Sequence, residues 1–243
     1  MTDVGPDRHR DILVMIDEIA SSDREPINVS HVCLACRDRL TAVGVAVYLV
    51  GTVQPLEVVG PVGDEMAELQ VTLGEGPVSE AVRQNQPVFV PQLANAWSSK
   101  RWPAFAPAAL AAGAAAVFVI PLTLGAIALG ALEICRDVDG PLSRDELADA
   151  LLCADTVTTL LLSRPAAPAA EAGELSHAEP EGRWAVVHQA TGMMSVQLDT
   201  DLGQAFLRLR AHAYLTGRRL SEVAADVVER RLRFTPETHE KKR

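Results

Sequence analysis

The sequence predicts an α/β domain, in which helices flank an antiparallel sheet, followed by an all-α bundle of three helices. In residues 8–163, apolar runs rich in β-branched residues, as in buried strands, lie between helical patterns. In residues 183–234, apolar side chains instead recur at three- and four-residue steps, the period of a helix. Residues 164–182 are rich in proline, alanine and acidic residues, which predicts a linker. Residues 235–243 form a charged tail.

The α/β domain is expected to begin with two helices and a hairpin. The helices cover residues 8–20 and 28–40, and each has an apolar face. Residues 42–50 are predicted to be a buried strand, because they are rich in valine. After a turn at residues 51–52, residues 55–59 pair back on this strand.

Two glycines around an acid mark the middle of this domain. The sequence L-G-E-G-P at residues 73–77 predicts a tight loop, and Pro77 suits the first turn of a helix that ends near Arg83. A short strand over residues 87–90 follows. Residues 97–105, which contain two tryptophans, are expected to be a loop.

Two further strands and a long helix complete the domain. Residues 114–121 and 126–135 are predicted to be adjacent antiparallel strands in the centre of the sheet. A helix covers residues 143–162, with Ser143 as its N-cap and Glu146 at the reciprocal capping position. Its apolar stripe is expected to pack on the sheet or on a second copy of the helix, and consists of Leu147, Leu151, Ala154, Val157 and Leu161.

Three amphipathic helices are predicted for the C-terminal bundle. They cover residues 183–198, a second segment that ends at Gly217, and residues 220–232. The acidic turn at residues 199–201 supplies N-cap oxygens for the second helix, and glycine at position 217 suits the left-handed end of a helix. Because three short helices bury a small core, dimerisation or the neighbouring domain is expected to support the bundle. The expected core is Val187, Ala190, Met194, Leu198, Leu202, Ala205, Phe206, Leu209, Ala213, Leu220, Val223, Ala224, Val227, Val228 and Leu232.

Charge is distributed unevenly along the chain. The formal net charge is -10, but residues 183–243 contain 11 Lys and Arg against 7 Asp and Glu, while residues 1–182 contain 11 against 25. An acidic body with a basic end is expected when one module of a protein contacts nucleic acid and the other does not.

The sequence shows no signal for export or for a membrane. Prolines and glycines break the apolar region 104–132 into pieces shorter than the roughly 18 residues of a membrane helix. The N-terminus lacks the basic start and apolar run of a signal peptide. We therefore expect a cytoplasmic protein with no membrane contact.

The four cysteines, Cys33, Cys36, Cys135 and Cys153, are expected to be structural. Disulfides are rare in the cytoplasm. Although Cys33 and Cys36 form a C-x-x-C pair, no second pair and no histidine pair follows at the spacing of a zinc site. A redox or metal role is the alternative. The sequence predicts no metal and no cofactor.

No enzymatic activity is expected. The six histidines are scattered, and no nucleophile elbow, phosphate-binding glycine loop or cluster with metal-ligand spacing is present. Glu75, in the tight loop, is expected to be a turn residue, with a buried catalytic acid as the alternative.

The C-terminal bundle resembles the ANTAR domain of bacterial transcription antiterminators. Three motifs carry the resemblance: V-x-x-A-x-G-x-M in the first helix, A-x-x-x-L-R-x-x-A in the second, and G-R-R-L-x-x-V-A at the start of the third. Their residues are Val187, Ala190, Gly192 and Met194; Ala205, Leu209, Arg210 and Ala213; and residues 217–224. The family often has a lysine immediately before the glycine of the first helix, where this chain has Thr191.

The resemblance implies binding to paired hairpin loops in nascent RNA. Arginines supply phosphate contacts and can stack on unpaired bases, and histidine and glutamine can contact base edges. The predicted RNA-binding residues are Arg183, His188, Gln189, Thr191, Arg208, Arg210, Arg218 and Arg219. Arg210 could instead pair with Asp226 or Glu222 inside the bundle, and Gly192 is expected to permit close helix approach. Further phosphate contacts could come from Arg230, Arg231 and Arg233, which otherwise form a solvated face.

Residues 8–163 resemble a GAF domain, a small-ligand and signalling module. The order of elements carries this resemblance, together with L-G-E-G-P at 73–77, R-W-P-x-F at 101–105, I-P-L at 120–122 and L-G-A-L at 129–132. No set of residues matches a known ligand site, so the small molecule or protein that provides the signal is unknown.

These observations predict a signal-responsive transcription antitermination regulator of the actinobacterial type with a GAF and an ANTAR domain. It is expected to be a homodimer that binds RNA hairpin loops and prevents a terminator from forming. The alternative is a sensor or scaffold that acts through protein contacts, with the bundle as a dimerisation unit. A regulator that binds duplex DNA is a third possibility.

Overall fold

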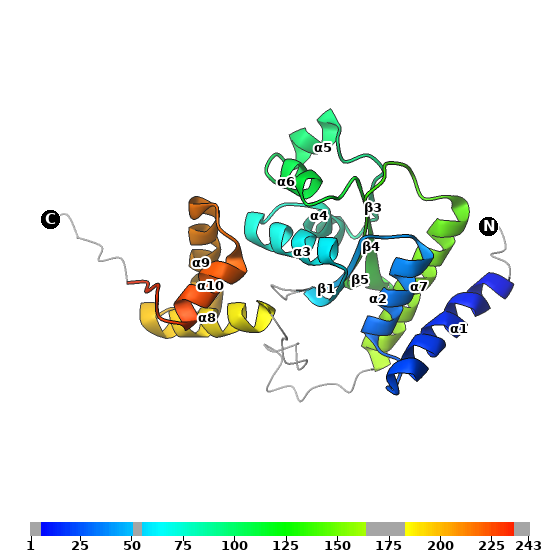
Figure 1. Ribbon diagram of the computed structural model, residues 1–243, viewed down its shortest axis with the longest axis horizontal. Coiled ribbons are helices and arrows are strands. Elements are labelled where there is room, and N and C mark those ends of the chain that lie inside the picture. Colours follow the sequence, from blue (N-terminus) through cyan, green and yellow to red (C-terminus); the bar gives the residue numbers. More distant parts are fainter. Residues whose placement is uncertain (1–5, 51–54, 164–182, 236–243) are drawn as a thin grey trace. The chain divides into compact units, whose positions relative to one another are not determined.

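The computed structural model describes residues 6–50, 55–163 and 183–235 (Figure 1). Contacts between Cα atoms divide the chain into two compact units, residues 1–175 and 176–243. The predicted turn at residues 51–52, the predicted linker and residues 236–243 of the predicted tail lie outside the described residues.

The first unit contains an antiparallel sheet in the order β2-β1-β5-β4-β3, which confirms the predicted α/β class. The long central strand β5 pairs with β1 and β4, and Glu133 on β5 lies opposite Ala46 and Val119. The strands are β1 (Gly44–Leu49), β2 (Pro55–Val59), β3 (Val88–Val90), β4 (Ala116–Leu124) and β5 (Ile127–Arg136).

One face of the sheet is covered by α2 (Val29–Arg39) and α7 (Arg144–Ser163), and α1 (Pro6–Asp23) packs on these two helices (Figure 1). Alternate strand residues point into this layer, as the twofold repeat of a strand requires. The largest buried side chains there are Ile12, Ile16, Leu40, Phe118, Leu122, Leu132 and Ile134.

The long helix α7 begins as predicted, and Ala154 and Val157 of its expected apolar stripe are buried in the core. Ser143 Oγ accepts from the Glu146 amide at 3.2 Å, and Glu146 Oε2 accepts from the Ser143 amide at 2.7 Å. This hydrogen bond from the backbone lowers the pKa of Glu146. Leu151, predicted to lie in the buried stripe, is 43% exposed, because the helix buries the residues on the side of Ala150, Cys153 and Val157.

The opposite face of the sheet is covered by α3 (Pro61–Leu73) and α4 (Pro77–Gln84), of which α3 was not anticipated by the sequence. Helix α3 packs on β1 through backbone atoms: a Cβ at Gly44 would lie 2.2 Å from the amide nitrogen of Gly63. Pro77 occupies the first turn of α4, as predicted.

The predicted loop at residues 97–105 is wrong, because this stretch lies largely in two short helices, α5 (Ala96–Arg101) and α6 (Phe105–Ala111). The Asn95 side chain accepts from the Ser98 amide and caps α5. At α6, Glu75 Oε1 accepts from the amides of Ala104 and Phe105, both at 2.8 Å. Glu75 therefore connects the tight loop to the N-terminus of α6, which lies 30 residues later in the chain.

The second unit is the predicted three-helix bundle, formed by α8 (Arg183–Leu198), α9 (Leu202–Thr216) and α10 (Leu220–Val228). Asp201 caps α9, and Gly217 ends it with φ +62°, both as predicted. Most of the expected core is buried, but Leu202 is 60% exposed because it is the first residue of α9.

The third helix ends earlier than the sequence pattern suggested. Instead of continuing to residue 232, α10 ends at Val228, and the amides of Arg231 and Leu232 both donate to the Asp226 carbonyl. Arg230 adopts a left-handed backbone with φ +62° at this turn. Residues 229–235 consequently do not continue the helix, and Leu232 is only partly buried.

The four cysteines are buried in the first unit as free thiols. Burial raises the pKa of Cys33 and Cys135, and a hydrogen bond to Cys153 together with burial raises that of Cys36, so these thiols stay protonated. Within the described ranges, no group of His, Cys, Asp and Glu side chains could hold a metal ion. None of the helices described is long and apolar enough to cross a membrane.

Candidate functional site

The first unit contains a buried polar cluster between the sheet and α3, formed by Tyr48, Gln70 and Glu133. Tyr48 Oη donates to Glu133 Oε2 at 2.8 Å, and Gln70 Nε2 donates to Glu133 Oε1 at 2.7 Å. Gln70 Oε1 in turn accepts from the Val78 amide at the start of α4. The cluster therefore connects two strands with both helices of this face.

Burial raises the pKa of Glu133 to about 7, and the hydrogen bonds from Tyr48 and Gln70 oppose the rise. The side chain has no exposed surface. Glu133 was not among the predicted site residues, although a single acid within the apolar strand I-A-L-G-A-L-E-I-C-R was a usable signal, because buried carboxyl groups need partners. A carboxyl group held here can change charge near neutral pH.

In the second unit, two of the predicted arginines, Arg208 and Arg210, lie on different sides of α9. Arg208 is exposed and Arg210 is half-buried, and the helical positions put them on opposite flanks of the exposed face of α9. Arg183 begins α8, and its side chain lies outside the described residues. Neither Arg208 nor Arg210 makes an ion pair within residues 183–235.

Arg218 takes the acidic partners that the sequence analysis considered for Arg210. Its Nη1 lies 2.8 Å from Asp226 Oδ2, and its Nε lies 3.8 Å from Glu222 Oε2. Arg231 Nε lies 2.7 Å from the other oxygen of Asp226. The two guanidinium groups lower the pKa of Asp226. Arg219 is exposed at the N-cap position of α10.

The predicted residues of α8 divide between the surface and the core. His188 and Gln189 are exposed. Thr191 is buried, and its hydroxyl donates to the Val187 carbonyl at 2.7 Å. The Thr191 side chain is therefore directed into the bundle rather than toward a ligand on the surface.

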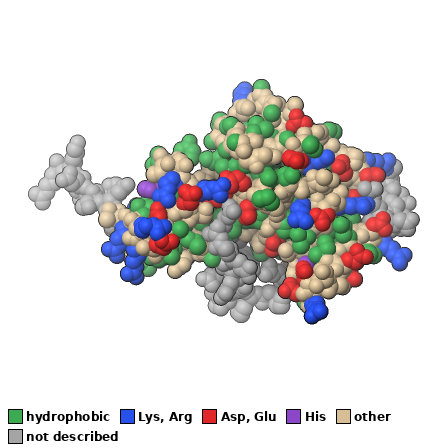
Figure 2. Space-filling model, viewed as in Figure 1, with side chains coloured by type: hydrophobic (Ala, Val, Ile, Leu, Met, Phe, Trp, Pro, Cys, Tyr) green, Lys and Arg blue, Asp and Glu red, His purple; other side chains and the backbone are tan. Residues whose placement is uncertain are grey.

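A surface hollow of about 430 Å³ on this unit was not found by sequence reasoning. It is lined by Gly192, Met193, Val196, Gln197, Arg230 and Arg233. Arginine side chains gather at the end of the unit that carries residues 229–235 (Figure 2). The glycine inside a helical pattern and the run R-R-L-R were the available signals, but their proximity depends on the early end of α10.

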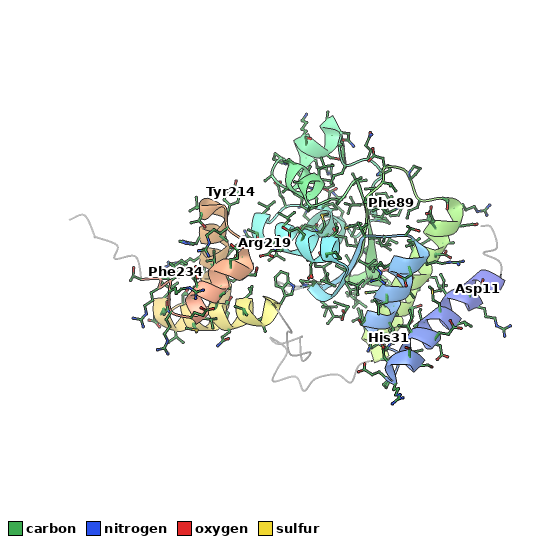
Figure 3. All side chains as sticks on the ribbon, in the orientation of Figure 1. Asp11, His31, Phe89, Tyr214, Arg219 and Phe234 are labelled. Carbon is green, nitrogen blue, oxygen red and sulfur yellow. The ribbon has the colours of Figure 1, made fainter. Side chains whose placement is uncertain are left out.

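The exposed face of α9 carries three large apolar or aromatic side chains beside polar ones. Leu207 and Leu215 are exposed, and so is Tyr214, which is near the end of the helix (Figure 3). Such a stripe is suited to contact with another protein surface or with an unpaired base. None of these three residues was predicted to have a role in binding.

Comparison with known proteins assigns both units to families. The family model of the GAF domain matches residues 28–161, and that of the ANTAR domain matches residues 183–228. GAF domains are associated with the sensing of signals, and ANTAR domains with RNA-binding antitermination regulators. The pairing is sensory and regulatory in kind.

Several solved structures are similar to part of this chain. The GAF domain of a phosphoenolpyruvate-protein phosphotransferase from Acinetobacter is 13% identical, with a TM-score of 0.46 over 66% of this chain and 93% of that one. A type II free methionine-R-sulfoxide reductase from Thermoplasma acidophilum is 19% identical, with a TM-score of 0.41 over 60% and 94%. No curated protein matches the chain.

The GAF match alone covers more than half of the chain, and the ANTAR match follows it in the order that the motifs predicted. The chain therefore belongs to the family of regulators in which a GAF domain is followed by an ANTAR domain.

Proposed function

We propose that this protein is a cytoplasmic, signal-responsive regulator that binds paired hairpin loops in nascent RNA and prevents a transcription terminator from forming. Residues 8–163 act as the sensor and residues 183–234 as the RNA-binding domain. The linker 164–182 joins them, and residues 235–243 form a charged tail.

The observation that carries this proposal is the uncompensated positive charge of an ANTAR domain. Within residues 183–235, acidic partners neutralise Arg218 and Arg231, whereas Arg208, Arg210, Arg230 and Arg233 make no ion pair. Guanidinium groups without partners are available for phosphates, because no intramolecular pair has to break first. The exposed residues His188 and Gln189 can contact base edges.

The mechanism links RNA binding to the sensor. Protein that holds an antiterminator hairpin keeps its strand out of the overlapping terminator, so polymerase continues. A small molecule or protein bound by the GAF domain frees or dimerises the RNA-binding domain. Thr191 is not expected to contact RNA in this mechanism, because its hydroxyl is used inside the bundle.

The test is a binding titration of the full chain with an RNA that carries two adjacent hexaloop hairpins, with duplex DNA as competitor. We expect selective binding that weakens steeply with salt. Arg208→Ala and Arg210→Ala should each weaken binding and reduce the salt slope by about 1. Arg83→Ala removes the same charge from the exposed surface of α4 and is the matched control, with no change expected. A folded chain that does not bind the hairpin RNA would refute the proposal.

A second candidate function is favoured by the apolar stripe on α9. Leu207, Tyr214 and Leu215 are all exposed, and exposed apolar side chains on one helix are suited to a protein contact. In this alternative the bundle is a dimerisation unit of a sensor or scaffold, and binding to the hairpin RNA is absent. Preference for duplex DNA in the competition would instead indicate a DNA-binding regulator.

A further inference from the structure

The hollow on the second unit has an apolar floor and a cationic rim. Met193 and Val196 come from the exposed side of α8, and Val196 is 84% exposed. Arg230 and Arg233 come from the segment that follows α10. Gln197 lies between the two walls, and Gln189 is on the same side of α8 one turn before Met193.

The wall formed by residues 229–235 is fixed to the bundle although it is not helical. The Phe234 amide donates to Gln197 Oε1 at 3.2 Å, and the Phe234 ring packs edge-on against His212 of α9 at 5.3 Å (Figure 3). Arg231 pairs with Asp226 of α10. Each of the three helices thus contributes a contact to this segment, so the hollow is a built feature of the fold.

Gly192 lowers the stability of α8 without serving the packing of the unit. The expectation that it permits close helix approach is wrong, because among the described residues a Cβ at this position would meet no atom of another element within 4 Å. Glycine in the middle of a helix is less favourable than alanine. What the glycine does provide is space in the hollow, since any side chain there would enter it.

Arg230 is the second lining residue that is unfavourable for its own backbone conformation. It occupies the left-handed position after a helix end, with φ +62°, where glycine is the favoured residue. Its guanidinium group makes no ion pair within the described residues. Gly192 and Arg230 thus both lower stability locally and both line the same hollow. This pattern is typical of a site retained for binding rather than for folding.

We propose that this hollow binds one unpaired nucleotide of a hairpin loop, with the base against Met193 and Val196 and the phosphate between Arg230 and Arg233. The assignment rests on the proposed RNA-binding function. A volume of about 430 Å³ is near the lower limit of small-ligand sites, which span roughly 300–1,000 Å³, and suits a single nucleotide. The two arginines at the rim favour an anionic occupant over an apolar helix. A base within a duplex cannot enter, whereas loop bases can turn outward.

The experiment uses the full chain and the RNA with two hexaloop hairpins. Gly192→Leu fills the hollow with a good helix former, and we expect about tenfold weaker binding with an unchanged salt slope. Arg230→Gly should weaken binding about tenfold, reduce the salt slope by about 1, and raise the unfolding midpoint, because it relieves the left-handed backbone. Ala185→Leu, on the same helix outside the hollow, is the matched control.

Abasic replacement of each loop position in turn identifies the bound base. At one position the abasic RNA should bind the parent about tenfold more weakly and show no further loss with Gly192→Leu. If both variants fold and bind as the parent does, the hollow is not the site, although the proposed RNA-binding function stands. A folded parent that binds no hairpin RNA refutes both proposals.

Discussion

The carboxyl group of Glu133 has no exposed surface, and burial raises its pKa from 4.5 to about 7. Between these two values the folded protein keeps a proton that the unfolded chain has released, so the free energy of unfolding falls as the pH rises. The full difference is on the order of 3 kcal/mol. Tyr48 and Cys135 face the same group, and their pKa values are raised above this window.

We predict that Glu133→Gln removes this pH dependence. The amide oxygen can accept from Gln70 and the amide nitrogen can donate to Tyr48, so both hydrogen bonds persist without the charge. In urea unfolding, the parent should have a lower free energy of unfolding at pH 8 than at pH 5. In the variant this difference should be largely absent. Asp155→Asn, which changes an exposed acid, should behave as the parent does. Parallel pH profiles for parent and Glu133→Gln would contradict the prediction.

At the scale of elements, the sequence was informative wherever a local pattern decided the structure. The strands rich in valine, the ends of α9 at Asp201 and Gly217, and the capping pair of α7 were all predicted. The helices α5 and α6 were missed because they are short and because the acceptor that caps α6, Glu75, lies far away in the chain.

The candidate site was predictable only in part for the same reason. Motif positions indicated arginines for RNA contact, but the partners of Arg218 depend on how α9 and α10 pack. The hollow requires the early end of α10 and the contact between Phe234 and Gln197, which no sequence period encodes.

Helix α5 is held to α4 by the pair between Arg101 and Glu80. Arg101 Nε donates to Glu80 Oε2 at 2.5 Å, and a second contact joins its Nη2 to Oε1. The Glu80 side chain is buried, and the guanidinium group also stacks on Trp97 at 4.8 Å. The pair holds α5 against α4, because the buried carboxylate of Glu80 requires a partner.

We predict that Arg101→Met lowers the free energy of unfolding by about 3 kcal/mol, because it leaves the Glu80 carboxylate buried without its partner. Replacing both residues, as Glu80→Met with Arg101→Met, should recover most of the loss, since no unpaired charge remains. Chemical unfolding of the single and double variants measures both values. A single variant as stable as the parent would show that water replaces the arginine.

At the scale of the whole molecule, we predict that the full chain is a homodimer with the stripe on α9 at its interface. Leu215 is 81% exposed, so Leu215→Glu should give a monomer in sedimentation without unfolding the bundle. Binding to a two-hairpin RNA should then fall toward that of one hairpin, because the avidity of two linked domains is lost. Leu124→Glu, an equally apolar exposed position in the first unit, is the control.

Two outcomes of this experiment would contradict the prediction that the stripe on α9 is the dimer interface. A Leu215→Glu variant that remains dimeric excludes the stripe as the interface. If such a dimer also loses RNA binding, the α9 stripe contacts RNA instead.

The contact between Gly44 and Gly63 has a mechanical consequence for the sensor. Because β1 and α3 touch through main-chain atoms, no flexible side chain lies at this point to absorb a displacement. A displacement of α3 at this point would therefore have to move β1, which is paired along its length with β5. The position of the sheet is in that sense tied to the position of α3 by two residues that have no side chain.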